Sequence, residues 1–234
     1  FSEDFKGFSL PTAATFKKRY GETVVKFEAA RVASSRRSEI AKFMVGRTQQ
    51  QLRFLGEGFE GSFNQFMAQT VPAAKLTCYK FESPADYVPE IKFRGVRYRG
   101  SQLSDLASLL LGEHKITKKV ADSLNWLAAS KDDALSLKDK KFVILGASAE
   151  LAPTEHLLRA GADVLWVDIQ SPDKFVNEKK GLTGRLYYGA EASDILLEPQ
   201  TIRATIEAFA GDDAVHVGMF AYAAGASQEW RLNV

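Results

Sequence analysis

The stretch KKFVILGASAELAPTEHLLRAGADVLWVDI, residues 140–169, decides the fold of the C-terminal part of this chain. Residues 142–145 form a short apolar run rich in β-branched side chains, and residues 164–167 form a second one. Gly146 ends the first run, and a helical segment that stops at Gly161 lies between the two. The stretch therefore predicts a strand, a turn, a helix and a second strand, which is the repeating unit of a parallel α/β sheet.

The glycine turn of this unit, GASAELA, carries a resemblance to a known family. It resembles the GASxGIG turn of the short-chain dehydrogenases/reductases, and the matching positions are Gly146, Ala147 and Ser148. Glu150 and Ala152 stand where that family has its second and third glycines. An acidic side chain at a helix N-terminus would compete with a pyrophosphate for the same backbone N–H groups. Two alternatives follow: the turn binds phosphate, or only its shape is retained.

The resemblance implies a set of cofactor-binding residues around the turn. Asp168 lies 22 positions after Gly146, close to the spacing at which an acid reaches the adenosine ribose of a dinucleotide. Because an acid there repels a ribose phosphate, the implied cofactor is NAD rather than NADP. Asp194 and Ile195 occupy the place that borders the adenine in the family. The residues implied to bind the cofactor are Gly146, Ala147, Ser148, Leu151, Asp168, Ile169, Asp194, Ile195, Ala224 and Gly225.

The rest of the C-terminal sequence continues the same pattern. RLYYG, residues 185–189, predicts a third strand, and the following residues 193–211 predict a loop and a helix. AVHVGMF predicts a fourth strand, which runs into YAAG, residues 222–225, a segment that resembles the family's Asn-Asn-Ala-Gly element. We therefore predict an α/β fold, with a Rossmann-like parallel sheet over residues 136–234 that is incomplete at the C-terminus. Residues 1–135 are predicted to form a mainly helical α+β domain.

The catalytic pair of the family is missing from this sequence. Its chemistry needs a tyrosine and a lysine four positions apart on a helix, because the lysine lowers the pKa of the phenol. No tyrosine of the chain is followed by a lysine at that spacing. Since the family's pair lies downstream of the segment at residues 222–225, we expect the chain to be a fragment. An unfinished sheet would expose apolar surface, so we also expect an oligomer or a complex subunit.

Two function classes remain open. In the first, the chain is the cofactor-binding portion of a short-chain dehydrogenase/reductase-like oxidoreductase, with the catalytic tyrosine and lysine outside it. In the second, it is a non-catalytic accessory or assembly subunit that keeps the Rossmann fold and docks a partner through its basic N-terminal region.

That basic region covers residues 17–53, which carry 10 basic and three acidic side chains. Apolar residues recur there at helical spacing, first at Val25, Ala29 and Val32 and then at Ile40, Phe43 and Met44. The aromatic side chains fall on the apolar face, which favours packing over base stacking, so a nucleic-acid partner is not predicted. The alternatives are a solvated face and an acidic protein partner. The residues expected to contact such a partner are Lys17, Lys18, Arg19, Arg36 and Arg37.

Between the basic region and the sheet, two segments alternate apolar with polar residues and predict strands: KLTCYKF, residues 75–81, and IKFRGVRYRG, residues 91–100. The shift of phase at Gly95 predicts a bulge or a tight turn. The basic side chains of the second segment have two alternative roles. They bind a carboxylate or a phosphate, or they form the solvent-exposed face of an edge strand. LGEGFEG, residues 55–61, matches G-x-G-x-x-G without a preceding apolar run, so it predicts a flexible link between helices.

Composition narrows the remaining classes. Residues 136–234 carry 10 basic and 14 acidic side chains, which leaves 21 basic and 15 acidic ones for residues 1–135. The single cysteine, Cys78, cannot form an intrachain disulfide and suits an intracellular, reducing compartment such as the cytoplasm or an organelle matrix. The three histidines are far apart in the sequence, so no metal site is predicted. No apolar run approaches the length of a transmembrane helix.

Overall fold

A computed structural model of the chain describes residues 3–9, 11–56, 58–83, 87–129 and 134–221. The chain divides after Gln69 into two compact units. Together the described residues form a mixed α/β structure with one five-stranded sheet, two two-stranded sheets and nine helices, one of them a short 3-10 helix. The α/β class predicted from the sequence is thus confirmed.

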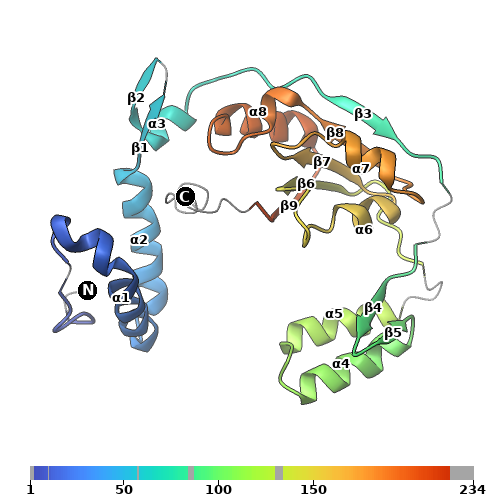
Figure 1. The fold of residues 1–234 in the computed structure, drawn as a ribbon, viewed down its shortest axis with the longest axis horizontal. Helices are drawn as coiled ribbons and strands as arrows, with labels where there is room; N and C mark the ends of the chain where they lie inside the picture. The colour runs from blue at the N-terminus through green and yellow to red at the C-terminus, as the bar shows by residue number, and fades with distance from the viewer. Residues whose placement is uncertain (1–2, 10, 57, 84–86, 130–133, 222–234) are drawn as a thin grey trace. The chain divides into compact units, whose positions relative to one another are not determined.

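The first unit begins with two helices, α1 (Ala13–Ala33) and α2 (Arg37–Gln51), drawn in blue in Figure 1. Strands β1 (Arg53–Gly56) and β2 (Phe59–Ser62) follow as an antiparallel hairpin, and α3 (Phe63–Met67) closes the unit. The expectation of a flexible link at residues 55–61 was therefore wrong. The segment forms a hairpin because Phe54 and Phe59 both contact the ring of Phe66 on α3, with ring centroids 3.5 and 5.3 Å apart.

The helices predicted for residues 17–53 are present, but most of their large apolar side chains are not covered by the described residues. Ile40 of α2 is buried, whereas Val25 of α1 is 69 % exposed and Phe43 of α2 is 54 % exposed. The helical spacing predicted from the sequence is confirmed. Of the apolar residues that defined it, Ile40 is buried by the described residues, and Val25, Ala29, Val32, Phe43 and Met44 are exposed.

The second unit contains a small module that precedes the parallel strands of the main sheet in the sequence. Strands β4 (Glu90–Phe93) and β5 (Val96–Arg99) form an antiparallel hairpin, followed by helices α4 (Gln102–Gly112) and α5 (Lys118–Ala128). Arg94 and Gly95 connect the strands with φ angles of 50° and 81°, which is the geometry of a two-residue hairpin turn. Of the two alternatives for Gly95, the tight turn is confirmed.

The main sheet has the strand order β3-β8-β7-β6-β9 (Figure 1). Four strands are parallel: β6 (Lys141–Leu145), β7 (Asp163–Val167), β8 (Arg185–Tyr188) and β9 (Val215–Met219). The fifth, β3 (Thr77–Lys80), pairs antiparallel with β8. Because β3 belongs to this sheet, the compact units divide after Gln69, whereas the sequence placed a boundary near residue 135.

Apolar side chains cover both faces of the central strands β6 and β7, as parallel sheets require, whereas Val217 and Met219 of β9 are exposed. On one face, Val164 and Trp166 of β7 pack with Leu158 of helix α6. On the other face, Val143 of β6 packs with Ile202 of helix α8. The helices and turns that connect the strands are α6 (Thr154–Arg159), α7 (Asp173–Glu178), the 3-10 helix η1 (Ala190–Ala192) and α8 (Pro199–Ala210).

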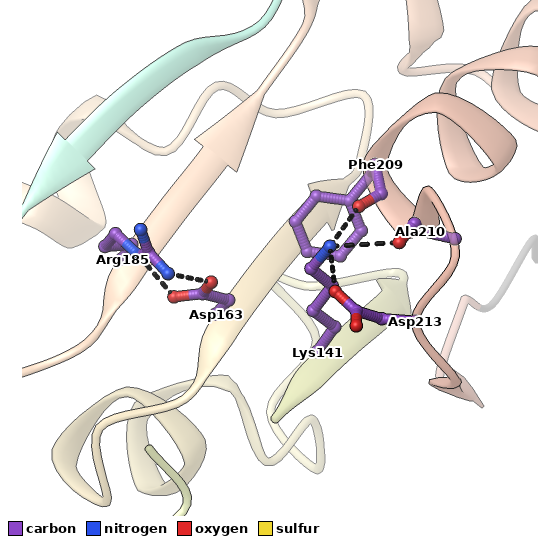
Figure 2. Close-up of polar contacts among 6 residues, drawn as sticks. All are labelled: Lys141, Asp163, Arg185, Phe209, Ala210 and Asp213. Atoms are coloured by element: carbon purple, nitrogen blue, oxygen red, sulfur yellow. Dashed lines mark hydrogen bonds and ion pairs between the residues drawn. The ribbon is translucent and has the colours of Figure 1, made fainter. Parts of the chain in front are cut away.

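Two polar contacts fix the amino ends of the parallel strands (Figure 2). Arg185 of β8 and Asp163 of β7 are register partners and form a two-pronged ion pair, with Nε of the arginine 2.6 Å from Oδ1 of the aspartate. Lys141 of β6 donates from Nζ to the last two carbonyl oxygens of α8, each at 3.0 Å, and lies 2.8 Å from Asp213. The lysine thus supplies a cation and donors at a helix C-terminus, where both stabilise.

Candidate functional site

A pocket of about 520 Å³ lies at the carboxyl ends of the parallel strands. Strand β7 lies on one side of β6 and β9 lies on the other, so the strand order reverses at β6. In open α/β sheets, ligands bind in the crevice at such a reversal of strand order. The structure brings six of the sequence-predicted residues together in the lining of this pocket: Gly146, Ser148, Asp168, Ile169, Asp194 and Ile195.

The other predicted residues have different positions. Ala147 is buried beneath the turn, and Leu151 is 85 % exposed on the far part of the turn, outside the lining of the pocket. Ala224 and Gly225 lie outside the described residues. Sequence reasoning missed seven lining residues: Ala149, Val167, Gln170, Ser193, Leu196, Phe220 and Ala221. Val167 is the last residue of β7, and Ser193 and Leu196 lie beyond η1 in the connection that follows β8. The other four lie in the segments that follow β6, β7 and β9, and this position after a parallel strand is the signal that could have identified them.

Gly146 is required by the packing of the chain itself. Its φ angle is 82°, a conformation that favours glycine. A Cβ atom placed there would lie 2.3 Å from the backbone nitrogen of Ala221, just beyond β9. The first glycine of the turn therefore allows the end of β9 to approach β6. This packing requirement explains a glycine at position 146 whether or not the turn binds a ligand.

Asp168 holds the glycine turn in place. Its Oδ2 accepts hydrogen bonds from the backbone N–H of Ser148 at 2.8 Å and from the Ser148 hydroxyl at 2.7 Å. Its Oδ1 accepts the N–H of Gln170 at 2.9 Å. Asp168 as a whole is only 8 % exposed. The acid expected to meet a ribose thus already binds three donors from two loops.

Other N–H groups of the turn are also used within it. The N–H of Ala149 donates to the carbonyl of Gly146 at 3.1 Å, and that of Ala152 donates to the carbonyl of Ala149 at 2.9 Å. Helix α6 starts only at Thr154, after Pro153, a residue that has no N–H to offer. Glu150 is exposed. The acid that takes an N–H group of the turn is therefore Asp168, whereas the sequence had indicated Glu150.

Asp194 organises the loop on the opposite side of the pocket. Its Oδ1 accepts the N–H groups of Leu196 at 2.8 Å and Leu197 at 3.2 Å. Glu198 supports the same loop, because its Oε2 accepts the N–H groups of Ser193 and Asp194, each at 3.2 Å. Both predicted acids of the pocket thus order the backbone around them.

The pocket is acidic and partly apolar. Among its described lining residues, Asp168 and Asp194 are the only charged side chains. Nearby on β8, burial raises the pKa of the Tyr188 phenol, and the negative charges of Asp173 and Asp168 raise it further. Ile169, which is 73 % exposed, lies with Ile195 and Leu196 in the lining and provides apolar surface. This arrangement suits a flat apolar ring that carries hydrogen-bond donors.

The residues predicted to contact a partner lie on α1 and at the start of α2, away from the sheet in the sequence. Among the residues proposed to meet a partner, Lys18, Arg19 and Arg37 are exposed, and Arg36 lies near Glu39 and Asp4, at 3.2 and 3.7 Å. The side chain of Lys17 is not among those that the structure describes. Cys78 is exposed on β3. In the part of the chain that the structure describes, no three His, Cys, Asp or Glu side chains cluster as a metal site would require, and no helix is long and apolar enough to cross a membrane.

Comparison with known proteins leaves the fold and the pocket as the basis for any functional conclusion. No family model, no curated protein and no solved structure matches this chain.

Proposed function

We propose that the main sheet and its helices form a Rossmann-like nucleotide-binding unit, and that the pocket at the carboxyl ends of its strands binds the adenosine part of NAD. The order of the parallel strands supports this proposal. Numbered along the chain from β6, the order β8-β7-β6-β9 is third, second, first and fourth, which matches the first four strands of the 3-2-1-4-5-6 order of a dinucleotide-binding sheet. The observation that carries the proposal is the position of Asp168 at the end of the second of these strands, in the lining of the pocket.

The residues of the pocket fit the adenosine half of the cofactor. A carboxylate has about four lone-pair sites, so Asp168, which accepts three hydrogen bonds, retains capacity for a ribose hydroxyl. The adenine ring would contact the apolar side chains of Ile169 and Ile195. A phosphate on the ribose would meet the Asp168 carboxylate, so NAD is preferred to NADP.

In this proposal the chain is the cofactor-binding portion of a short-chain dehydrogenase/reductase-like oxidoreductase. The bound nicotinamide would supply hydride transfer. The sequence contains no tyrosine with a lysine four residues later, so the proton donor of that family is not provided by these residues. We therefore expect the chain to bind the cofactor without reducing or oxidising a substrate.

Calorimetric titration with NAD and with NADP tests the proposal. We expect NAD to bind more tightly, and we expect Asp168→Ala to remove the preference between the two cofactors. Asp212→Ala is the matched control, because Asp212 is an exposed acid before β9, at the amino end of the sheet. Tighter binding of NADP by the unaltered chain would contradict the role given to Asp168.

Replacing Glu150 with glycine tests the turn separately. This change restores the residue found in the family, yet the N–H of Ser148 remains bonded to Asp168. We therefore expect NAD affinity to change by less than about threefold, well below the tenfold that corresponds to 1.4 kcal/mol. A larger gain would show that the charge of Glu150, and not Asp168, limits phosphate binding.

A second candidate function is that of an accessory subunit that docks an acidic partner through α1 and α2. The observation that favours it is an exposed stripe on α1, where Phe16, Tyr20 and Val24 follow each other at intervals of four residues. Exposed apolar surface next to basic side chains is typical of an interaction site.

This candidate is tested with poly-glutamate as the probe. Binding of the full chain should weaken steeply as salt rises, because screening shortens the reach of exposed charges. Replacing Lys18, Arg19 and Arg37 with glutamate reverses their charge and should weaken the binding of poly-glutamate further. Binding that is unaffected by both changes would leave the basic side chains as a solvated face.

A further inference from the structure

The pocket at the carboxyl ends of the strands is suited to a nucleoside and unsuited to a phosphate. We propose that this pocket recognises only the adenosine part of NAD and gives the phosphates no favourable contact, so that free adenosine binds more tightly than any adenosine-containing ligand that carries a phosphate. The inference rests on the proposed adenosine site and narrows the chemical class of its ligand.

The first argument concerns the backbone donors of the turn. A phosphate at a glycine turn is held by free N–H groups and by the N-terminus of the helix that follows. Here the N–H of Ser148 is bonded to the Asp168 carboxylate, and the N–H of Ala149 is bonded within the turn. Helix α6 has only six residues and begins beyond Pro153. A phosphate would have to break bonds that the turn already makes.

The second argument concerns charge. Within the described lining, the charged side chains are the carboxylates of Asp168 and Asp194, and no lysine or arginine accompanies them. Glu150 adds a third, exposed carboxylate on the turn itself. Repulsion between a phosphate and a partly buried carboxylate a few ångströms away is expected to lower affinity by about tenfold.

The third argument concerns what the pocket can accept. Asp194 uses Oδ1 for two backbone N–H groups, and Asp168 uses both of its oxygens for three donors, so each carboxylate retains acceptor capacity. Ribose hydroxyls and the exocyclic amino group of adenine are donors, and both suit acceptor-only side chains. A volume of about 520 Å³ lies in the lower half of the range for ligand pockets.

The arrangement also resists a simple rearrangement that would admit phosphate. Asp168 is tied to the loop after β7 through Gln170, and the carbonyl of Gln170 accepts a hydrogen bond from the Trp166 indole at 2.8 Å. Trp166 is itself buried in the core. Moving the carboxylate away from the turn would therefore disturb a loop that is anchored in the sheet.

The test is calorimetric titration of the full chain with adenosine, AMP, ADP and NAD at one pH and one ionic strength. We expect adenosine to bind about tenfold more tightly than AMP, and AMP more tightly than ADP. Equal or tighter binding of AMP would overturn the inference. If NAD binds more tightly than adenosine, the inference fails and the proposed cofactor site stands. If none of the four ligands binds to a cooperatively folded sample, both fail.

A variant removes the charge. Asp168→Asn keeps an oxygen that can accept the N–H of Ser148, although its amide nitrogen cannot accept the N–H of Gln170. Because the negative charge is gone, the ratio of adenosine to AMP affinity should fall toward one. Asp212→Asn makes the same change at the amino end of the sheet and should leave the ratio unaltered. Thermal unfolding of each variant verifies that it is folded. A ratio that stays at about ten in Asp168→Asn would contradict the electrostatic cause.

Discussion

The two ends of the main sheet use acidic side chains in different ways. At the amino ends of the strands, Asp163 and Asp213 are paired with Arg185 and Lys141 (Figure 2). At the carboxyl ends, Asp168 accepts donors from the backbone and from Ser148, and no lysine or arginine is among the described residues that line the pocket. An acid paired with a cation is neutralised, whereas an acid held by N–H groups keeps its full charge and part of its acceptor capacity.

Size does not distinguish the two ends. A second pocket, of about 510 Å³, lies at the amino end and includes Asp163 and Arg185 in its lining. Because these two side chains bind each other, they offer little to a ligand. Lys80, Lys138 and Asp139 also line this pocket, so its charge is mixed, whereas the described lining at the carboxyl end carries acids alone. The sign of the charge, rather than the size of the pocket, therefore distinguishes the candidate site.

The largest expected effect comes from Gly146→Ala at the carboxyl end. The new Cβ would collide with the backbone of Ala221 in a conformation with positive φ. Strain and overpacking together should lower the free energy of unfolding by about 3 kcal/mol or more. Gly181→Ala is the control, because Gly181 also has a positive φ but has open space around it, and it should lose about 1 to 2 kcal/mol. Urea unfolding measures both, and equal losses would show that the close approach to β9 does not matter.

The second effect tests the paired acid at the amino end. Arg185→Met leaves the carboxylate of Asp163, which is 4 % exposed, without its partner. Removing one member of a buried pair costs about 3 to 5 kcal/mol, and because Arg185 is half exposed we expect about 2 to 3 kcal/mol. Lys174→Met, which removes one member of an exposed pair with Glu178, should cost less than about 0.5 kcal/mol. Similar losses in the two variants would remove the distinction between this pair and a surface pair.

A smaller effect is expected at the carboxyl end from Ser148→Ala. The change removes the hydroxyl that donates to Asp168 but leaves the backbone N–H bond. We expect a loss of about 1 kcal/mol in the free energy of unfolding, measured by urea denaturation. Ser123→Ala on α5, where the hydroxyl bonds a carbonyl of its own helix, should stay within about 0.5 kcal/mol of the unaltered chain. No loss in Ser148→Ala would mean that the turn does not depend on Asp168.

The smallest effect is a pH dependence at the amino end. The hydrogen bond from Lys141 lowers the pKa of Asp213 below its usual value. The stability from this pair is therefore fully present above the unfolded pKa, about 4, and is lost as the pH falls through the lower pKa of the folded state. Asp213→Asn should thus lower the urea midpoint at neutral pH, and the difference from the unaltered chain should disappear under strongly acidic conditions. A difference that grows on acidification would contradict this sign.

Much of the sheet could be predicted because its signals are local. The apolar runs of β6 and β7, the glycines at 146 and 161 and the helical spacing of α8 each fix one element without distant contacts. The antiparallel strand β3 could not be placed, because its partner β8 lies more than a hundred residues away in the sequence. The hairpin of β1 and β2 was missed because it depends on a contact with Phe66, which lies outside the segment 55–61 on which the prediction was based.

About half of the lining of the candidate site was predictable, but its hydrogen bonds were not. The spacing of Gly146 and Asp168 brings both to the carboxyl ends of neighbouring strands, as the sequence indicated. Spacing says nothing about which donor a carboxylate binds, so the bond from Ser148 to Asp168 became visible only in three dimensions. The competing acid was therefore sought at Glu150, within the turn, instead of at the end of the next strand.

Strand β3 has a consequence for the order in which the chain folds. Strands β6, β7 and β8 follow one another closely in the sequence, so they can pair by closing short loops. The pairing of Thr77 with Tyr188 instead closes a loop that contains the whole module of β4, β5, α4 and α5. Contacts of such high sequence separation have a larger entropic cost and slow the folding of a domain. We expect β3 to join last, after β8 is in place, so the exposed edge of β8 is the part of the sheet most open to wrong pairing during synthesis.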